Sequence, residues 1–542
     1  MKAWKIKVLS LLLALSLLLT GCGMVDLEGY VAGLKSVLVG ESAVPFASME
    51  YQRPDMAFLR GELDKTIALS QSEESGVEAV VDAVFAFYDA YDWFYTHYAL
   101  ADIHYCKDMT DIYWEKEYSY CLENSTQADA MLEELYYALA KSPLREELEG
   151  EDYFGAGFFD DYEGENPWDE TFTALLEQEA QLQNRYYELS AMALEEVPGT
   201  AEYYDLCAGE MMELLVELIR LRQQIADYWG YEDYVQFAGD FYYYREYTPE
   251  EMAAYLEQIR LELVEIYCRL TERDWQGAYE YSGEKETYAY VRTAAENMGG
   301  QVWEAFQLMD QGDLYDISYG PNKYEASFEI YLTGYYEPFV FVNPTMSRYD
   351  CLTFAHEFGH FCNDYASYGT YAGVDVTEVF SQGMEYLSLC YGENTQELAR
   401  MKMADSLSVY VEQAAYAAFE QQMYDLEGEA LTAESLQALY RSVAESYGFG
   451  AVEYDPREFV TITHFYTNPM YVISDVVSND AAMQLYQLEQ ENPGAGLQRL
   501  EENLDTNAQY FLEFLDSAGL ESPFAPERLG QVRETFETIF GK

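Results

Sequence analysis

The sequence predicts a mainly α-helical fold with one small β-sheet. Long stretches carry apolar residues at three- and four-residue spacing, which is typical of amphipathic helices. The chain has only 14 Pro in 542 residues, so few helices are interrupted. One short region instead combines β-branched and aromatic runs with glycine, which favours strands. A chain of this length is expected to form two or more packed regions.

Helices are expected first between about residues 72 and 190. The stretch EAVVDAVFAFYDAYDWFYTHYALADIHY has helical spacing, as do ADAMLEELYYALAKSP, which stops at Pro143, and LLEQEAQLQNRYYELSAMAL. A loop rich in Gly, Asp and Phe separates the last two. We therefore expect an N-terminal helical domain over residues 22–199.

A second region, residues 200–542, is expected to hold the catalytic domain. AEYYDLCAGEMMELLVELIRLRQQIADYWGY reads as one long helix, and Thr248-Pro249-Glu250-Glu251 has the residues of a helix start with a capping box. Residues 314–343 predict the small sheet, with about three strands. Helices are expected again from Tyr349 to the end.

The charge is strongly acidic, with 30 Lys+Arg against 98 Asp+Glu and a formal net charge of −68. Nucleic acid is excluded as a partner, because binding phosphates needs a basic surface. The acidic residues are spread along the chain, as expected for a solvated surface.

The N-terminus reads as an export signal. The basic stretch MKAWKIK precedes the apolar stretch VLSLLLALSLLL. The apolar stretch is shorter than a permanent transmembrane helix usually is. Leu19-Thr20-Gly21-Cys22 resembles a bacterial lipobox. We expect residues 1–21 to be removed as a lipoprotein signal peptide and Cys22 to be lipidated, so that the protein is held at the extracellular face of the cytoplasmic membrane by this anchor alone. An ordinary signal peptide or an anchor helix is the alternative.

The stretch FAHEFGHFCNDY is the strongest chemical signal. His356 and His360 are four residues apart, so a helix would place both imidazoles on one face, toward a single zinc ion. Glu357, one step round, can reach a metal-bound water as a general base. The chain has only five His, and the apolar flanks predict a buried helix, where two histidines need partners.

A zinc site needs a third protein ligand. VDVTEVFSQGMEYLSL predicts a second helix in which Glu378 and Glu385 share a face. By spacing alone, either could bind zinc while the other bonds the far nitrogen of a ligand histidine.

These blocks resemble the oligoendopeptidase F and thimet oligopeptidase family of zinc metallopeptidases. The HEFGH core and the block Glu378-Val379-Phe380-Ser381-Gln382, with Glu385 following, are similar to the family's zinc motifs. The resemblance implies that Glu378 is the third ligand of one Zn²⁺ and that Glu385 supports a ligand. It also implies a two-lobed helical zincin with the small sheet beside the zinc helix and a deep substrate channel.

Two further blocks carry the resemblance. His464 to Asp475 is similar to the family's His/Tyr segment, which implies that His464 and Tyr471 face the zinc across the substrate, with Tyr466 among the substrate contacts. The stretch EPFVFVN, residues 337–343, is similar to a strand that lies beside bound peptide, which implies contacts from Phe339, Phe341 and Asn343. An exposed edge strand can pair with an extended peptide.

The expected activity is therefore that of an oligoendopeptidase acting on short peptides, as a monomer. A zinc aminopeptidase or thermolysin-like protease is the enzyme alternative, and a non-catalytic peptide-binding lipoprotein is the non-enzyme alternative. The 18-residue step from His360 to Glu378 is shorter than is usual in relatives, and Ile473 stands where many relatives have Tyr.

The remaining histidines and cysteines are expected to have structural or surface roles. His97 and His104 lie seven apart on a predicted helix without a third ligand nearby. The seven cysteines after Cys22 form no CxxC motif, and most are expected to be buried thiols, Cys351 and Cys362 among them.

Overall fold

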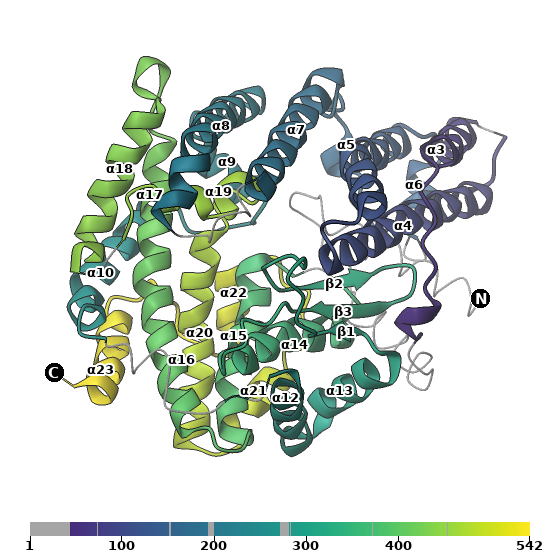
Figure 1. Ribbon diagram of the computed structural model, residues 1–542. Helices are drawn as coiled ribbons and strands as arrows, with labels where there is room; N and C mark the ends of the chain where they lie inside the picture. Colours follow the sequence, from purple (N-terminus) through teal and green to yellow (C-terminus); the bar gives the residue numbers. More distant parts are fainter. Residues whose placement is uncertain are drawn as a thin grey trace.

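The computed structural model describes residues 44–541, except 73, 151–152, 193–199, 271–280, 282, 371 and 452–453. The predicted signal peptide and Cys22 lie outside the described residues. Within these ranges no helix has both the length and the apolar character that a membrane span requires. The fold is mainly helical with one small sheet, as the sequence predicts (Figure 1).

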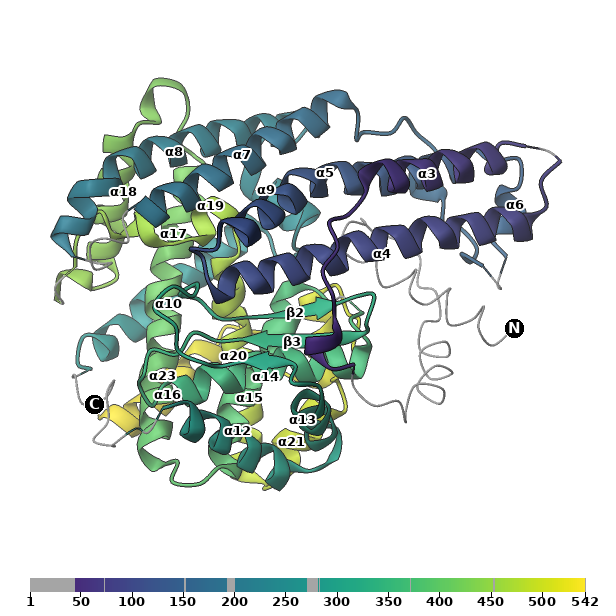
Figure 2. The same ribbon diagram turned by 45° about the vertical axis from the view of Figure 1, so that its right-hand side comes forward.

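The N-terminal region consists of long helices that run side by side (Figure 2). They are α3 (Met56–Ser70), α4 (Val77–Lys107), α5 (Ile112–Ala140), the short α6 (Arg145–Leu148) and α7 (Glu170–Met192). A smaller apolar core joins α3, α4 and α5 and ends at Tyr162. Helix α7 instead contributes Phe172 and Tyr186 to the larger core. The predicted domain boundary at residue 199 falls among residues that are not described, so it stays a prediction.

The larger core holds the remaining elements. Its first helices are α8 (Ala201–Tyr228), α9 (Tyr234–Phe241), α10 (Pro249–Tyr267), α12 (Glu284–Met298) and α13 (Gly300–Gly312). Helix α10 begins as predicted, because Thr248 and Glu251 form a reciprocal capping box behind Pro249.

The small sheet lies at residues 315–341, close to the predicted range. Its strands are β1 (Tyr315–Asp316), β2 (Phe328–Leu332) and β3 (Glu337–Phe341), in the order β1-β3-β2. Strand β3 is central: Val340 pairs with Tyr315 in parallel and with Glu329 antiparallel. Strand β2 therefore forms an edge of the sheet.

Helices complete the fold after the sheet. They are α14 (Asp350–Ser367), α15 (Val374–Tyr391), α16 (Gln396–Ser408), the π-helix η4 (Val409–Gln413), α17 (Ala414–Met423), α18 (Ala433–Ser446), α19 (His464–Thr467), α20 (Val472–Glu491), α21 (Ala495–Glu501), α22 (Phe511–Ala518) and α23 (Arg528–Phe540). Helix α15 lies between α14 and α20, and α14 lies against the sheet (Figure 1).

The cysteines that follow Cys22 all have free thiols and form no disulfide. Cys351 and Cys362 are fully buried on α14, which agrees with the predicted packing role. His97 accepts a hydrogen bond at Nδ1 from the Gln52 amide at 3.2 Å, and His104 stacks on Trp114 with 4.2 Å between ring centres. Both histidines are structural, as expected.

The N-terminal helices should lose stability as the pH rises. Burial, together with the Asp89 carboxylate, raises the pKa of Asp92 on α4 to about 8. Its pKa in the unfolded chain is about 3.9, so its contribution to stability is complete below about pH 4 and is lost as the pH rises toward 8. Between pH 5 and pH 8, the melting temperature of the Asp92→Asn variant should therefore fall less than that of the parent.

One such carboxyl group changes the free energy of unfolding by at most about 1.4 kcal/mol per pH unit. The control is Asp82→Asn, at an exposed position of the same helix. If the melting temperatures of the parent and the Asp92 variant changed equally with pH, the raised pKa of Asp92 would be contradicted.

Candidate metal centre and active site

Helix α14 carries the two predicted histidine ligands. Its first turn is fixed by Asp350, whose carboxylate accepts hydrogen bonds from the amide and hydroxyl of Thr345 at 2.8 and 2.7 Å. The rings of His356 and His360 lie on one face with their centres 5.1 Å apart. Glu357 is buried beside them, and the three residues offer ligand atoms that all lie within 4.8 Å of one another.

Gly359 sets how closely α14 and α15 approach each other. A Cβ atom at this position would lie 2.5 Å from the Phe380 carbonyl oxygen and 2.6 Å from the Ser381 Cα. Both are backbone atoms of α15, so no side chain could move aside to make room. The glycine of HEFGH therefore allows the contact that brings the α15 carboxylates to the histidines.

Glu378 lies between the two imidazoles. Its Oε2 is 3.4 Å from Nε2 of His356, and its Oε1 is 3.5 Å from Nε2 of His360. Two ligands about 2.1 Å from a tetrahedral zinc ion lie about 3.4 Å from each other. Two imidazoles and a carboxylate at this spacing fit a zinc site.

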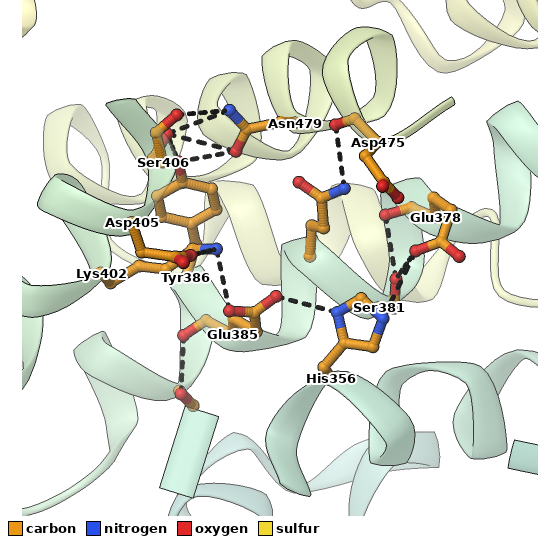
Figure 3. A network of polar contacts seen from close by, with 12 residues as sticks. His356, Glu378, Ser381, Glu385, Tyr386, Lys402, Asp405, Ser406, Asp475 and Asn479 are labelled. Carbon is orange, nitrogen blue, oxygen red and sulfur yellow. Dashed lines mark hydrogen bonds and ion pairs between the residues drawn. The ribbon is translucent and has the colours of Figure 1, made fainter. Parts of the chain in front are cut away.

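Glu385 supports His356 from the opposite side. Its Oε1 lies 2.9 Å from Nδ1 of His356, which leaves Nε2 for a metal. Its Oε2 lies 2.8 Å from Nζ of the fully buried Lys402, and Lys402 also pairs with Asp405 at 3.2 Å (Figure 3). The two α15 carboxylates thus have the separate positions that the family resemblance implies.

Two hydroxyl groups hold the Glu378 carboxylate. Ser381 donates to Oε2 at 2.7 Å from the next turn of α15 (Figure 3), and Tyr471 donates to Oε1. The Tyr471 ring stacks on His464, with ring centres 4.6 Å apart and planes within 5°. The structure therefore brings His464 and Tyr471 to the metal centre.

The electrostatics of the site favour a cation. Burial alone would lower the pKa of His356, but Glu385, Glu378 and Glu357 outweigh it and raise that pKa to about 10. Burial opposes the charged form of Glu378, yet the two histidines and Tyr471 keep its pKa well below the usual range. A proton or a metal ion is thus stabilised among these carboxylates.

Burial shifts the pKa values of the other candidate groups. Burial, with the Glu378 carboxylate, raises the pKa of Tyr471 well above its usual value, so its hydroxyl remains a hydrogen-bond donor. Burial lowers the pKa of His464, although Glu378 acts in the opposite direction. Burial also raises the pKa of Glu357.

The predicted contacts of substrate with β3 and with Tyr466 of α19 need correction. Phe339, Phe341 and Tyr466 are fully buried, so their side chains cannot touch a peptide in this structure. Strand β3 also lies between β1 and β2 in the sheet. Where it pairs with these strands, it has no free edge for a peptide. Asn343 is half-buried and bonds the backbone of Gly320 and Lys323, each at 3.4 Å. The edge that lies beside α14 belongs to β2.

The short connection between α14 and α15 is tightly packed. Gly369 has a φ of +68°, and a Cβ there would lie 2.2 Å from the Tyr331 ring on β2. The amide of Gly373 donates to the Ala508 carbonyl at 2.9 Å. This connection therefore rests on β2 and on the segment before α22.

The sequence analysis did not identify Lys402 and Ser381 as residues that support the site. Ser381 lies three residues after Glu378 on a predicted helix, a spacing that allows contact. Lys402 lies between two methionines in RMKMADSL, and a cation with apolar neighbours in an acidic chain is the available signal. Its pairing with Glu385 joins α16 to α15, which local spacing does not reveal.

Comparison with known proteins supports a peptidase. Residues 46–166 match the family model of the peptidase M3 N-terminal domain. No curated protein sequence matches the chain.

Solved structures share the fold across nearly the whole chain. One named as an oligoendopeptidase F has a TM-score of 0.79 and 20% identity, and the alignment covers 92% of this chain and 99% of that one. PZ peptidase A with an inhibitor has a TM-score of 0.77, 18% identity and coverages of 92% and 99%. An oligoendopeptidase F from Bacillus anthracis has a TM-score of 0.74, 19% identity and coverages of 92% and 98%. The N-terminal match supports the resemblance to this family, and these structures confirm the mainly α fold.

Replacing Gly359 should open the site. The Gly359→Ala side chain would collide with the α15 backbone, so the two helices must separate and move Glu378 away from the histidines. We expect zinc affinity to fall at least about tenfold, measured by competition with a chromogenic chelator.

The matched control is Gly209→Ala on α8, where a Cβ meets nothing within 4 Å. This change should leave zinc affinity unaltered and stabilise the helix by up to about 1 kcal/mol. Unchanged zinc binding in a folded Gly359 variant would contradict the packing argument.

Proposed function

We propose that this chain, an M3-type metallopeptidase by its N-terminal family match and its oligoendopeptidase F fold, is a zinc-dependent oligoendopeptidase of short peptides. The observation that carries the proposal is the Glu378 carboxylate, whose two oxygens lie 3.4 and 3.5 Å from the Nε2 atoms of His356 and His360, next to the buried Glu357.

His356, His360 and Glu378 would hold the zinc ion, and Glu385 would fix the orientation of His356. When bound, zinc supplies a Lewis acid that polarises a carbonyl oxygen and acidifies water. Glu357 takes the proton from the attacking water and later delivers it to the leaving amine.

The negative charge that develops on the scissile carbonyl needs hydrogen-bond donors. The Tyr471 hydroxyl and the His464 ring N–H are the donors that we assign to it. The Tyr471 hydroxyl already lies within hydrogen-bond distance of Glu378, and its raised pKa keeps its proton in place.

The substrate backbone is proposed to pair with β2. This strand forms an edge of the sheet and contacts α14, which carries Glu357. Main-chain pairing accepts many sequences, which suits an enzyme acting on varied short peptides. A deep channel that admits only short peptides and a monomeric state are parts of the same proposal.

The location is proposed from the sequence alone. The lipobox at Leu19–Cys22 would tether the mature protein by lipid to the outer face of the bacterial cytoplasmic membrane. Peptides outside that membrane would then be its substrates.

The Glu357→Gln variant tests the chemistry. It keeps the size of the side chain but removes the base, so kcat should fall by about 10²–10⁴-fold. Zinc content, measured by atomic emission, should equal that of the parent. A fully active variant with bound zinc would overturn the assigned role.

Peptides with a blocked N-terminus separate the proposed activity from that of a strict aminopeptidase and from peptide binding without cleavage. An oligoendopeptidase should cleave them at internal bonds, and mass spectrometry should locate the new ends. A strict aminopeptidase leaves them intact, and a peptide-binding lipoprotein leaves both blocked and free peptides intact with zinc present. Either result would overturn the proposal.

A further inference from the structure

The segment Thr463–Tyr471 carries both proposed donors but has little regular structure of its own. It contains the single turn α19, and Met470 has a φ of +66°. Left-handed backbone at a non-glycine residue is strained and persists only where the surroundings impose it. The position of Tyr471 therefore depends on contacts from other elements.

Arg222 on α8 makes the strongest of these contacts. Its guanidinium donates from Nη1 to the Phe465 carbonyl and from Nη2 to the Tyr466 carbonyl, each at 2.6 Å. Its Nε donates to Oε1 of Glu179 at 2.7 Å. Arg222 is fully buried, so these bonds are shielded from water, and the planar fork fixes the direction of both carbonyls.

One face of α7 contacts the same segment. Glu179, Gln183 and Tyr186 follow each other at helical spacing. Glu179 holds Arg222, Gln183 donates to the Thr467 carbonyl at 3.4 Å, and the Tyr186 ring stacks on Tyr466 at 4.1 Å. The helix that precedes the catalytic region is thereby linked to the donor segment.

Two further bonds fix the end of the segment. The Tyr243 hydroxyl donates to the Pro469 carbonyl at 2.8 Å, and the Met470 amide donates to Oε1 of the buried Glu420 at 2.7 Å. Tyr471 follows directly. The segment is thus held from Phe465 to Met470, and within the described part of the chain its charged hydrogen-bond donor is Arg222.

We infer that Arg222, held by Glu179 of α7, is a positioning residue that sets the Tyr471 hydroxyl and the His464 ring against the reacting carbonyl. Arg222 touches neither the metal ligands nor Glu357 in the contacts that the structure records. It acts through the backbone of the donor segment. This inference rests on the proposed function, because it assigns a role in the same reaction.

The inference predicts a selective loss of turnover. Arg222→Lys keeps the positive charge but lacks the planar guanidinium group. The lysine can therefore no longer bond both carbonyl groups and Glu179 at the same time. We expect kcat on a blocked peptide to fall at least about tenfold, while KM and the zinc dissociation constant stay within about twofold.

Arg528→Lys is the matched control. Arg528 is an equally buried arginine whose Nε donates to the Asp480 carboxylate at 2.7 Å, away from the donor segment. Its substitution should lower the melting temperature to a similar extent with kcat within about twofold of the parent. Equal losses of kcat in the two variants would overturn the inference.

A double-variant cycle shows whether Arg222 acts through Tyr471. If it does, Arg222→Lys should lower kcat much less in a Tyr471→Phe background than in the parent. Independent, fully multiplicative losses would contradict the inference. A parent enzyme without peptidase activity would instead refute the proposed function, so the two failures are distinguishable.

Two less disruptive variants keep the inference testable if Arg222→Lys does not fold. Tyr243→Phe removes only the hydroxyl bonded to Pro469, and Tyr255→Phe removes a buried hydroxyl without a hydrogen-bond partner. Only the first should lower kcat, by at least about threefold. Equal kcat values in the two variants would overturn the inference.

Discussion

The contact between α14 and α15 at Gly359 is the constraint on which the site depends. It brings the Glu378 carboxylate within 3.5 Å of both ligand histidines. A larger residue at 359 would meet backbone, which cannot move aside. Without this approach His356 and His360 would lack the third ligand that we propose, because Glu378 lies on the second helix.

Buried cations support this arrangement in a strongly acidic chain. Lys402 neutralises Glu385 behind His356, and Arg222 binds Glu179 behind the donor segment. Arg245 pairs with Asp375 in the first turn of α15 at 3.3 Å, and Tyr247 donates to the same carboxylate at 2.7 Å. Unpaired buried carboxylates would be costly, so these few cations allow acidic residues to stand inside the fold.

Much of the fold and of the candidate metal site could be predicted because the relevant signals are local. Helical spacing placed His356, His360 and Glu357, and the capping residues placed the start of α10. Spacing left Glu378 and Glu385 equivalent, since both lie on one face of α15. Only the family resemblance, and then the packing of α14 against α15, distinguished the role proposed for Glu378 from that proposed for Glu385.

The remaining features depend on contacts between distant segments. The order β1-β3-β2 makes β3 central, which reverses the expectation for Phe339 and Phe341, and strand order is not encoded in any one strand. Lys402 and Arg222 likewise gain their roles from partners 17 or more residues away. Single-sequence patterns do not reveal such pairs.

X-ray absorption spectroscopy of the zinc-loaded protein tests the central claim most directly. The account predicts one zinc ion per chain, with two imidazole nitrogens and oxygen ligands at about 2.0–2.2 Å and no sulfur ligand. The Glu378→Gln variant should weaken binding and change this first shell. Sulfur ligation, or a shell that is unchanged when Glu378 is replaced, would contradict the assigned ligand set.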